Sequence, residues 1–447
     1  MSTVSAIDER TQIRRAVIAS TVGTSIEWYD YFLYSTVTGL VFAKLFFPTN
    51  DPLTGTLNAF GIYAVGFVAR PIGAAIFGHY GDRIGRKTTL IATLMLMGIG
   101  TFLVAFVPGY SSIGIWGAII LSILRFVQGV GVGGEWGGSV LMSLEWGHRG
   151  KRGFLASWPQ FGVPCGLFLA NLAVLAFTAI SGNDFINWGW RVPFGLSIVL
   201  VGVGLWIRLG ILETPLFQRL LEEKRIERTP VIEVIKRNPK EILLSAFLRL
   251  SEQAPFYLFT SFIFAYGTTT LKQPQQFLLI AVLCAAVLSF FSVPFFGYLS
   301  DHVGRKKVYL AGTVVTGIFG FIWIGLLGTL VPGLIFLAIV LSLIPHDMQY
   351  GPQAALIAES FTGRLRYSGA SIGYQLASVI AGGPAPLIAT ALFAAYKTGW
   401  AIAGYILLCS VISFIATAMV TERSKQDISI EYDAVPVTPI PAAAGEG

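Results

Sequence analysis

Several ionisable side chains lie inside long apolar stretches of the sequence, where a charge is costly. Glu27 and Asp30 are three residues apart in the first such stretch and would share one face of a helix. A charge at the centre of a bilayer costs about 2.5–3.5 kcal/mol on insertion scales, so each buried charge is a functional candidate. Two carboxylates this close in a low-dielectric environment cannot easily both ionise, which suits a proton-coupling site. The alternative is that one of them pairs with Arg70 or Arg125 and holds helices together.

Two arginines in other apolar stretches could bind an anionic group. Arg125 has a planar guanidinium that can hold a carboxylate through two hydrogen bonds. It could equally be a permanent partner of Glu27 or Asp30. Arg249 precedes Glu252 by three residues, so the two could satisfy one another, or Arg249 could bind a ligand. Both arginines are therefore candidate binding residues.

Uncharged polar side chains recur at helical spacing in the same stretches. Each could orient a hydroxyl or carboxyl group of a ligand, and each could equally hold two helices together. With the arginines, the candidate binding residues are Tyr34, Gln128, Glu135, Gln160, Tyr257, Tyr350, Gln353, Tyr374 and Gln375.

The whole chain is built from apolar stretches. Of 447 residues, 54% are apolar and 12% are charged, about half the charged fraction of a soluble protein. Runs long enough to cross a bilayer as helices recur twelve times. They lie near residues 16–43, 56–77, 88–108, 113–144, 154–181, 192–212, 242–267, 275–298, 308–330, 332–358, 368–395 and 399–420. The sequence therefore predicts an all-α, polytopic membrane protein.

The basic residues indicate the orientation of these spans. Most of the 31 Lys and Arg residues fall in the head, the tail, the middle loop and the loops that follow even-numbered spans. By the positive-inside rule, these segments and both termini are cytoplasmic. The basic residues form no patch that would track phosphates, so no nucleic acid partner is expected. The first span is too long for a cleavable signal peptide. The three cysteines fall within spans, so no disulfides are expected.

The charged loops repeat at a fixed distance. Residues 78–87, GHYGDRIGRK, and residues 297–306, GYLSDHVGRK, share the pattern G-x-x-x-D-x-x-G-R-K and lie 219 residues apart. Glu145 is followed seven residues later by Arg152, and Glu359 is followed in the same way by Arg366. Such a repeat indicates two related halves.

The repeat divides the chain into five segments. They are a cytoplasmic head at 1–15, six spans at 16–212, a charged middle loop at 213–240, six spans at 241–420 and a tail at 421–447. The Pro, Ala and Gly content of the tail indicates disorder.

One glycine-rich stretch imitates a nucleotide-binding motif. Residues 129–134, GVGVGG, match G-x-G-x-x-G, but no strand precedes them and they lie inside a span. Small residues there more plausibly let helices approach closely. No Walker A, H-E-x-x-H or G-x-S-x-G motif occurs, and the four histidines lack metal-ligand spacing. We therefore do not expect this protein to be an enzyme or an ATP-driven pump, and we expect it to bind no cofactor and no metal.

The paired loops, the twelve spans and the repeated E-x6-R elements resemble the major facilitator superfamily over residues 15–425. Shorter motifs resemble its metabolite:proton symporter family: EWYDY at 27–31, FVARP at 67–71, GGEWGG at 133–138 and NWGWRVPF at 187–194. That family includes bacterial carriers of shikimate, 2-oxoglutarate, citrate, proline and betaine.

The resemblance implies two pseudo-symmetric six-helix bundles that rock about a site near the bilayer midplane. Spans one, four, seven and ten would line the cavity, and spans three, six, nine and twelve would face lipid. Charges at the cytoplasmic span ends could form a network that closes the inside and breaks when it opens. The candidate gate residues are Asp82, Arg86, Glu145, Arg152 and Glu213 in the first half, and Asp301, Arg305, Glu359, Arg366 and Glu422 in the second.

We therefore expect a proton-coupled symporter that imports a small organic acid across a bacterial inner membrane. Its partners would be that substrate, a proton and the lipid bilayer, and we expect a monomer. Three alternatives remain open: a symporter of a zwitterionic osmolyte such as proline or betaine, an exporter working by proton exchange, and a sensor on the same scaffold that transports nothing.

Overall fold

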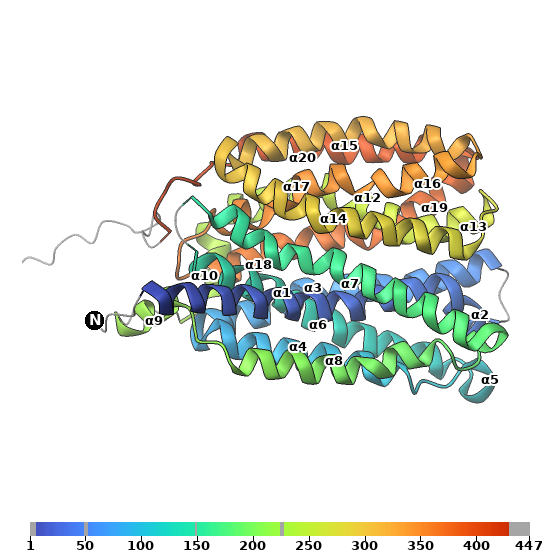
Figure 1. The fold of residues 1–447 in the computed structure, drawn as a ribbon, viewed down its shortest axis with the longest axis horizontal. Helices are drawn as coiled ribbons and strands as arrows, with labels where there is room; N and C mark the ends of the chain where they lie inside the picture. Colours follow the sequence, from blue (N-terminus) through green and yellow to red (C-terminus); the bar gives the residue numbers. More distant parts are fainter. Residues whose placement is uncertain (1–5, 49–51, 148–149, 224–227, 429–447) are drawn as a thin grey trace, which may run out of the picture.

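The computed structural model describes residues 6–48, 52–147, 150–223 and 228–428. These residues form a bundle of helices that run along one common axis, with both described chain ends at the same end (Figure 1). No strand occurs in the described ranges. The prediction of an all-α fold is confirmed. The expectation of disorder falls mostly on residues 429–447, which lie outside the described residues.

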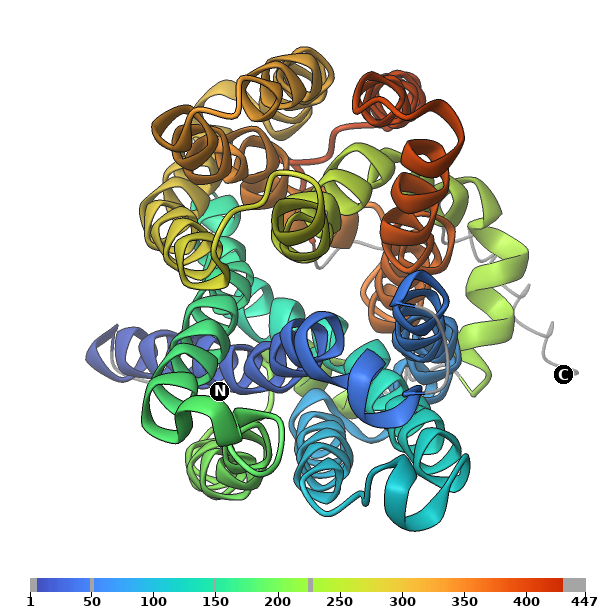
Figure 2. The ribbon, with the colours of Figure 1, turned by 90° about the vertical axis from the view of Figure 1, so that its right-hand side faces the viewer.

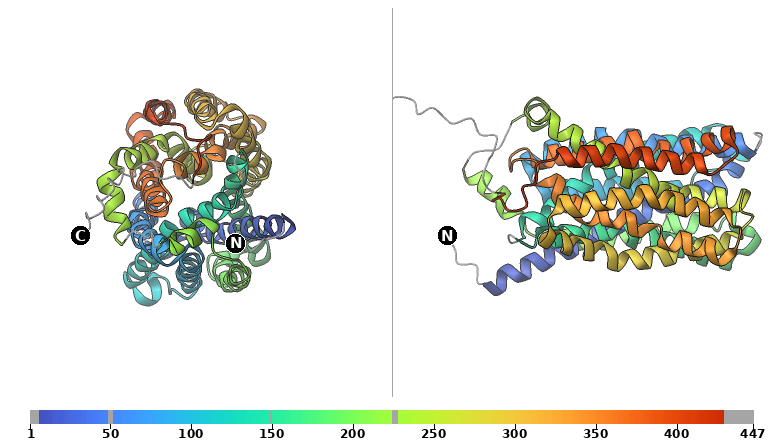
Figure 3. Two further views of the ribbon diagram at one scale, coloured as in Figure 1. Left: turned by 90° about the vertical axis from the view of Figure 1, so that its left-hand side faces the viewer. Right: turned by 90° about the horizontal axis from the view of Figure 1, so that it is seen from above.

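The N-terminal half contains long helices joined by short connections. Its helices are α1 (Ala6–Val37), α2 (Ala43–Phe46), α3 (Pro52–Ile84), α4 (Arg86–Val104), α5 (Tyr110–Ile113), α6 (Trp116–Glu145), α7 (Arg152–Ser181) and α8 (Arg191–Leu209). A π-helical turn at Thr38–Phe42 follows α1, and a 3-10 turn at Gly182–Phe185 follows α7. The first helix begins at Ala6, ten residues before the expected start of the first span, and its first turns extend past the bundle (Figure 3, right).

Two short helices, α9 (Pro215–Glu222) and α10 (Pro230–Arg237), lie in the middle loop. The C-terminal half contains α11 (Pro239–Leu248), α12 (Leu250–Tyr257), α13 (Ile263–Thr269), α14 (Gln275–Val303), α15 (Arg305–Gly328), α16 (Pro332–Leu341), α17 (Leu343–Ala358), α18 (Arg366–Ala377), α19 (Pro384–Tyr396) and α20 (Trp400–Met419). Further π-helical turns lie at Leu258–Phe262 and Ser378–Gly382.

Ten helical stretches in the described part of the chain are long and apolar enough to cross a membrane. The other two expected spans correspond to α1 and to the series α11–α13. The first carries Glu27 and Asp30 within its length, and the second is interrupted at Arg249 and again by the π-helical turn. Polar and charged residues in these two spans lower their hydropathy and make insertion into the membrane more costly.

The two halves pack face to face. In Figure 2 the N-terminal helices occupy one side of the molecule and the C-terminal helices the other. Contact between the halves is most extensive where α7 packs against α14 and where α3 packs against α18, and α6 and α7 also contact α18 and α17. The helices α8, α15 and α20 expose large apolar side chains, among them Trp206, Ile318 and Leu408, as lipid-facing helices do.

The repeated glycines serve the connections between helices. Gly85 and Gly304 have φ of 111° and 110°, a conformation that favours glycine, and each separates two spans. Gly78 and Gly297 act differently, because they allow close contact between the halves. A Cβ on Gly78 would lie 2.9 Å from Ser368 Cα, and one on Gly297 would lie 2.5 Å from Ser157 Cβ.

Candidate functional site

Two buried arginines meet around the ring of Tyr31 in α1. The guanidinium carbon of Arg70, in α3, lies 4.3 Å from the ring centroid, and that of Arg125, in α6, lies 4.1 Å from it. Arg125 also lies 4.5 and 4.9 Å from the ring centroids of Tyr34 and Tyr63. All five side chains are at most 1% exposed. The helices α1, α3 and α6 thus bring two positive charges into one aromatic cluster.

Both guanidinium groups keep donors without an acceptor. Nη1 of Arg70 donates to Ser378 Oγ at 3.4 Å, and Nη1 of Arg125 donates to Gln128 Oε1 at 3.2 Å. Nε and Nη2 of each arginine have no hydrogen-bond partner among the described residues. No ion pair within the described ranges involves either arginine. Since buried donors are normally satisfied, this cluster has unused capacity to bind an acceptor.

Tyrosine hydroxyls add to this capacity. The hydroxyls of Tyr31, Tyr34, Tyr63 and Tyr257 also lack a partner among the described residues. Tyr257 comes from α12, and its ring lies 6.3 Å from that of Tyr31 and 6.4 Å from that of Tyr63. The cluster therefore lies where the two halves meet. We call Arg70, Arg125, Tyr31, Tyr34, Tyr63 and Tyr257 the arginine–tyrosine cluster. Chemically it can bind an anion, and a carboxylate matches the planar fork of arginine.

The acidic residues of α1 face the interior of the N-terminal half. Glu27 pairs with Arg208 of α8 at 3.6 Å, and Arg208 also forms a close ion pair with Glu135 of α6. Asp30 accepts a hydrogen bond from Ser197 Oγ at 2.7 Å. In the described structure, the partner of Glu27 is thus Arg208, and not Arg70 or Arg125 as the structural alternative supposed. Glu27 and Asp30 thus lie in α1 beside Tyr31 and Tyr34, the two residues that α1 contributes to the arginine–tyrosine cluster.

Glu27 and Glu135 share one guanidinium. With both carboxylates ionised, this buried group carries one net negative charge, and one proton neutralises it. Thr93 Oγ1 donates to Glu135 at 3.0 Å, which helps to hold that carboxylate in place. The arrangement is chemically suited to taking up and releasing a single proton.

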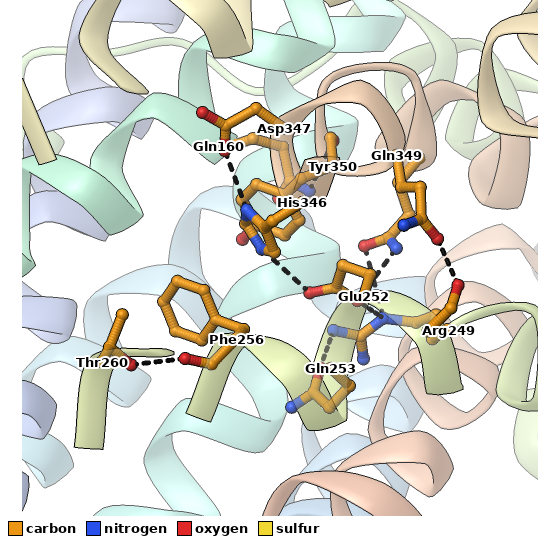
Figure 4. Close-up of polar contacts among 12 residues, drawn as sticks. Gln160, Arg249, Glu252, Gln253, Phe256, Thr260, His346, Asp347, Gln349 and Tyr350 are labelled. Atoms are coloured by element: carbon orange, nitrogen blue, oxygen red, sulfur yellow. Dashed lines mark hydrogen bonds and ion pairs between the residues drawn. The ribbon is translucent and has the colours of Figure 1, made fainter. Parts of the chain in front are cut away.

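Arg249 in the C-terminal half has its own partners. Its Nε lies 3.2 Å from Glu252 Oε2 and donates to Gln353 Oε1 at 3.3 Å. Its other nitrogens donate to Gln253 and to the carbonyl of Tyr374, and its guanidinium lies 3.2 Å from the Tyr374 ring centroid. Figure 4 labels Arg249, Glu252 and Gln253 of this group. Of the two alternatives for Arg249, the described contacts favour internal pairing with Glu252.

His346 of α17 lies beside the same carboxylate. Its Nε2 is 3.4 Å from Glu252 Oε1, and its Nδ1 is 2.8 Å from Asp347 Oδ1 (Figure 4). Asp347 in turn accepts a hydrogen bond from Ser292 of α14. All three titratable side chains are at most 3% exposed. His346, Glu252 and Asp347 thus form a buried cluster of titratable side chains in the C-terminal half.

The remaining candidate residues connect helices, several across the two halves. Gln160 of α7 donates to the carbonyl of Tyr350 at 3.3 Å, and Gln375 donates to the carbonyl of Val132 at 3.3 Å. The hydroxyls of Tyr350 and Tyr374 are 3.4 Å apart, and the Tyr374 ring stacks on Trp136 at 3.7 Å. These side chains link the halves just beside the titratable groups.

The gate candidates gather at one end of the bundle, which we call the charged end: residues 82–86, 145–152, 301–305 and 359–366. Each half contributes an aspartate that binds a helix N-terminus of the other half. Asp82 accepts hydrogen bonds from Tyr367 N at 3.3 Å and Ser368 N at 2.9 Å. Asp301 accepts hydrogen bonds from Gly153 N and Phe154 N, both at 2.8 Å. A carboxylate is stabilised there by the unpaired N–H groups and the helix dipole.

Ion pairs at the charged end also cross between the halves. Arg152 lies 3.6 Å from Glu359, and Arg366 lies 3.7 Å from Glu145. The networks predicted from sequence kept each arginine within its own half, so this pairing is a correction. It arises because α7 and α18 start at the arginines and point these N-terminal turns at the opposite half.

Contacts within each half complete the charged end. Arg86 lies 3.4 Å from Asp82 and 3.5 Å from Glu145, while Arg305 lies 3.3 Å from Asp301 and 3.0 Å from Glu359. The two remaining acidic gate candidates, Glu213 and Glu422, contact backbone N–H groups. Glu213 accepts from Lys87 N at 3.1 Å, and Glu422 accepts from Arg305 N at 2.8 Å.

Two packed halves of membrane-spanning helices, with a buried polar site between them and matched charged loops at one end, define a membrane transporter. Residues 16–242 match the family model described as sugar (and other) transporter. The chain is 39% identical over 417 residues to the shikimate transporter of Escherichia coli strain K12, covering 92% of this chain and 95% of the relative. It belongs to this family of the major facilitator superfamily, as the sequence motifs predicted, and its relatives are transporters, not enzymes.

Two further similarities agree with this assignment. The chain is 29% identical over 432 residues to the proline/betaine transporter of the same organism, covering 93% of this chain and 85% of the relative. Among solved structures, the proton:xylose symporter XylE matches with a TM-score of 0.75 at 17% identity, covering 94% of this chain and 98% of that one. The latter similarity concerns the fold.

Sequence reasoning missed several members of these groups. Arg70, Tyr31 and Tyr63 were not candidate binding residues, and Arg208 and His346 were not candidate proton-coupling residues. The available signal was burial of charge, since Arg70 and His346 were each recognisable as ionisable residues inside a span. Arg208 gives a weaker signal, because it lies close to the expected end of its span at 192–212.

Proposed function

We propose that this protein is a proton-coupled symporter that imports a small organic acid by alternating access. The observation that carries the proposal is the arginine–tyrosine cluster, in which two buried guanidiniums and four tyrosine hydroxyls have unused hydrogen-bonding atoms. Such a set offers hydrogen-bond donors and positive charge. A mono- or dicarboxylate supplies the acceptor oxygens and the negative charge that match them. The name of the shikimate transporter, a relative at 39% identity, agrees with a hydroxylated carboxylate as substrate.

The local charge favours an acid over a zwitterion. A zwitterion such as proline or betaine brings a cation as well as a carboxylate, and cations bind to carboxylates or to aromatic faces. Around Tyr31, Tyr34 and Tyr63 the aromatic faces are already contacted by Arg70 and Arg125. Glu27 and Glu252 form ion pairs with Arg208 and Arg249, and Asp30 accepts a hydrogen bond from Ser197. An osmolyte symporter, suggested by the proline/betaine relative, remains the second candidate.

We assign proton coupling in the N-terminal half to Glu27 and Asp30, with Glu135 and Arg208 as partners of Glu27. Glu27 and the arginine–tyrosine cluster are joined through α1, since Tyr31 follows Glu27 by one helical turn. Protonation of the Glu27–Glu135 pair removes one buried charge and leaves Arg208 fully matched. The resulting change in helix packing can then reach Tyr31 directly along α1.

The charged end would be the cytoplasmic gate, with both termini in the cytoplasm and the multi-pass bundle in a bacterial inner membrane. Asp82 and Asp301 would close the inside by binding the opposite half, and Arg152 and Arg366 would strengthen the closure. Buried pairs of this kind can bias two nearly balanced states by a few kcal/mol, about 10²-fold in population.

The experiment is transport by purified protein in liposomes after an imposed pH step. Radiolabelled shikimate, 2-oxoglutarate, proline and betaine are offered separately, with a protonophore as control. We expect accumulation of an organic acid that the protonophore abolishes. Accumulation of only proline or betaine would establish the osmolyte symporter. Binding without accumulation of any of the four would favour a sensor.

A further inference from the structure

We propose that His346, held between Glu252 and Asp347, is a second proton-binding centre whose proton is exchanged during the transport cycle. This inference rests on the proton coupling proposed above and extends it, because it places a proton-binding centre in each half of the protein.

The hydrogen-bond geometry of the imidazole is the first argument. A carboxylate oxygen faces each ring nitrogen of His346, at 2.8 Å from Nδ1 and 3.4 Å from Nε2. A neutral imidazole carries one N–H and can donate to only one of these carboxylates, whereas the imidazolium donates to both. The arrangement therefore matches the protonated ring, and loss of the proton leaves one of the two facing carboxylate oxygens without an imidazole N–H.

The local charge count is the second argument. Within ion-pair distance of Glu252 and Asp347, the described residues supply Arg249 and His346. One guanidinium and two carboxylates leave a net charge of minus one, which a single proton on His346 neutralises. A buried charge without a counter-charge is costly, so the group gains or loses its proton together with a change in its surroundings.

The other side chains around His346 do not alter this count. The groups that face the centre come from six elements. They are Arg249 from the junction of α11 and α12, Glu252 from α12, Asp347 and Tyr350 from α17, Tyr374 from α18 and Tyr309 from α15, with the Ser292 hydroxyl from α14 and the Gln160 amide from α7. The tyrosines, the serine and the glutamine are neutral hydrogen-bonding groups. They can reorient around either charge state without supplying a charge of their own.

The position of the centre connects it to movement of the two halves. The His346 ring packs on Phe256 at 4.6 Å and on Tyr350 at 4.8 Å. Phe256 contacts Phe32 of α1, and the Tyr350 carbonyl accepts a hydrogen bond from Gln160 of α7. Both contacts cross between the halves. A change of charge on His346 would therefore act where the halves touch (Figure 4).

The test separates proton binding from transport. The chain has four histidines, so side-chain NMR of histidine-labelled protein can resolve His346 by loss of its signal in His346→Gln. The signal is followed between about pH 5 and pH 9, on both sides of the usual histidine range. In parallel, pH-driven accumulation and equilibrium exchange of shikimate are measured in liposomes. His79→Gln, which changes a histidine of α3 outside the charged end, is the matched control.

We expect the His346 signal to titrate, and the protonated fraction at a given pH to fall in Glu252→Gln. His346→Gln should accumulate shikimate only to the level reached without a pH step while retaining exchange, and His79→Gln should match wild type. A His346 signal that does not change over this range, or full pH-driven accumulation by His346→Gln, overturns the inference. If wild type itself shows no pH-driven accumulation of any tested solute, the proposed function fails first, and this inference falls with it.

Discussion

Arg70 and Arg125 share one aromatic ring: their guanidinium carbons lie 4.3 and 4.1 Å from the centroid of Tyr31. Cation–π contacts stabilise each arginine by about 0.5–2 kcal/mol, which is less than the cost of burying an unpaired charge. The aromatic cluster alone therefore does not compensate two positive charges. An anionic substrate would supply the missing compensation.

The first prediction concerns closure of the charged end. Asp82→Asn removes the charge that binds the first turn of α18 and replaces one of the two acceptor oxygens, which face Tyr367 N and Ser368 N, with a donor NH2 group. Hydrogen bonds to charged groups contribute about 1.5–3 kcal/mol, so closure should weaken by about tenfold or more. Uptake per inserted molecule should fall strongly while membrane abundance is unchanged. Arg83→Gln, which changes an exposed residue next to Asp82, is the control. Wild-type uptake by Asp82→Asn would show that Asp82 does not hold the charged end closed.

The second prediction concerns close contact between α14 and α7. Gly297→Val places a Cβ 2.5 Å from Ser157 Cβ, which neither helix can accommodate without moving apart. In a chain whose native cysteines are replaced by serine, a cysteine at the buried position Ser300 should then label faster with a maleimide. Gly202→Val provides the control, because no atom lies within 4 Å of its added Cβ. Equal labelling in both variants would show that this contact does not hold the charged end closed.

The third prediction concerns the shared arginine of the N-terminal half. Arg208→Gln leaves both Glu27 and Glu135 without a cation, and breaking a buried ion pair costs about 3–5 kcal/mol. Glu27→Gln leaves Arg208 paired with Glu135. Thermal unfolding of the purified proteins should therefore show a large loss of stability for Arg208→Gln and a small change for Glu27→Gln. Similar melting temperatures for the two variants would contradict the assignment of Arg208 as the common partner.

Features that depend on residues close together in the sequence could be predicted, whereas features that depend on contacts between distant residues could not. The fold and the repeated loops were predictable because apolar length and motif spacing are local properties. The pairing of Arg249 with Glu252 was available as an alternative because it spans one helical turn. The partner of Glu27 was not predictable, because Arg208 is distant in sequence and the choice depends on which helix faces α1. Asp82 was predicted to join side-chain ion pairs, but its partners across the halves include backbone N–H groups, which carry no residue-type signal.

The central claim is that Arg70 and Arg125 together bind an organic acid. The most direct measurement is ligand-induced thermal stabilisation of wild type, Arg70→Lys and Arg125→Lys, with exposed Arg237→Lys as control.

Shikimate or 2-oxoglutarate should stabilise wild type and Arg237→Lys, whereas proline and betaine should not. Either buried lysine should weaken the acid about tenfold or more, because it loses the bidentate hydrogen bonds of the guanidinium. Unchanged acid binding in both lysine variants, or stabilisation by proline or betaine alone, would contradict the claim.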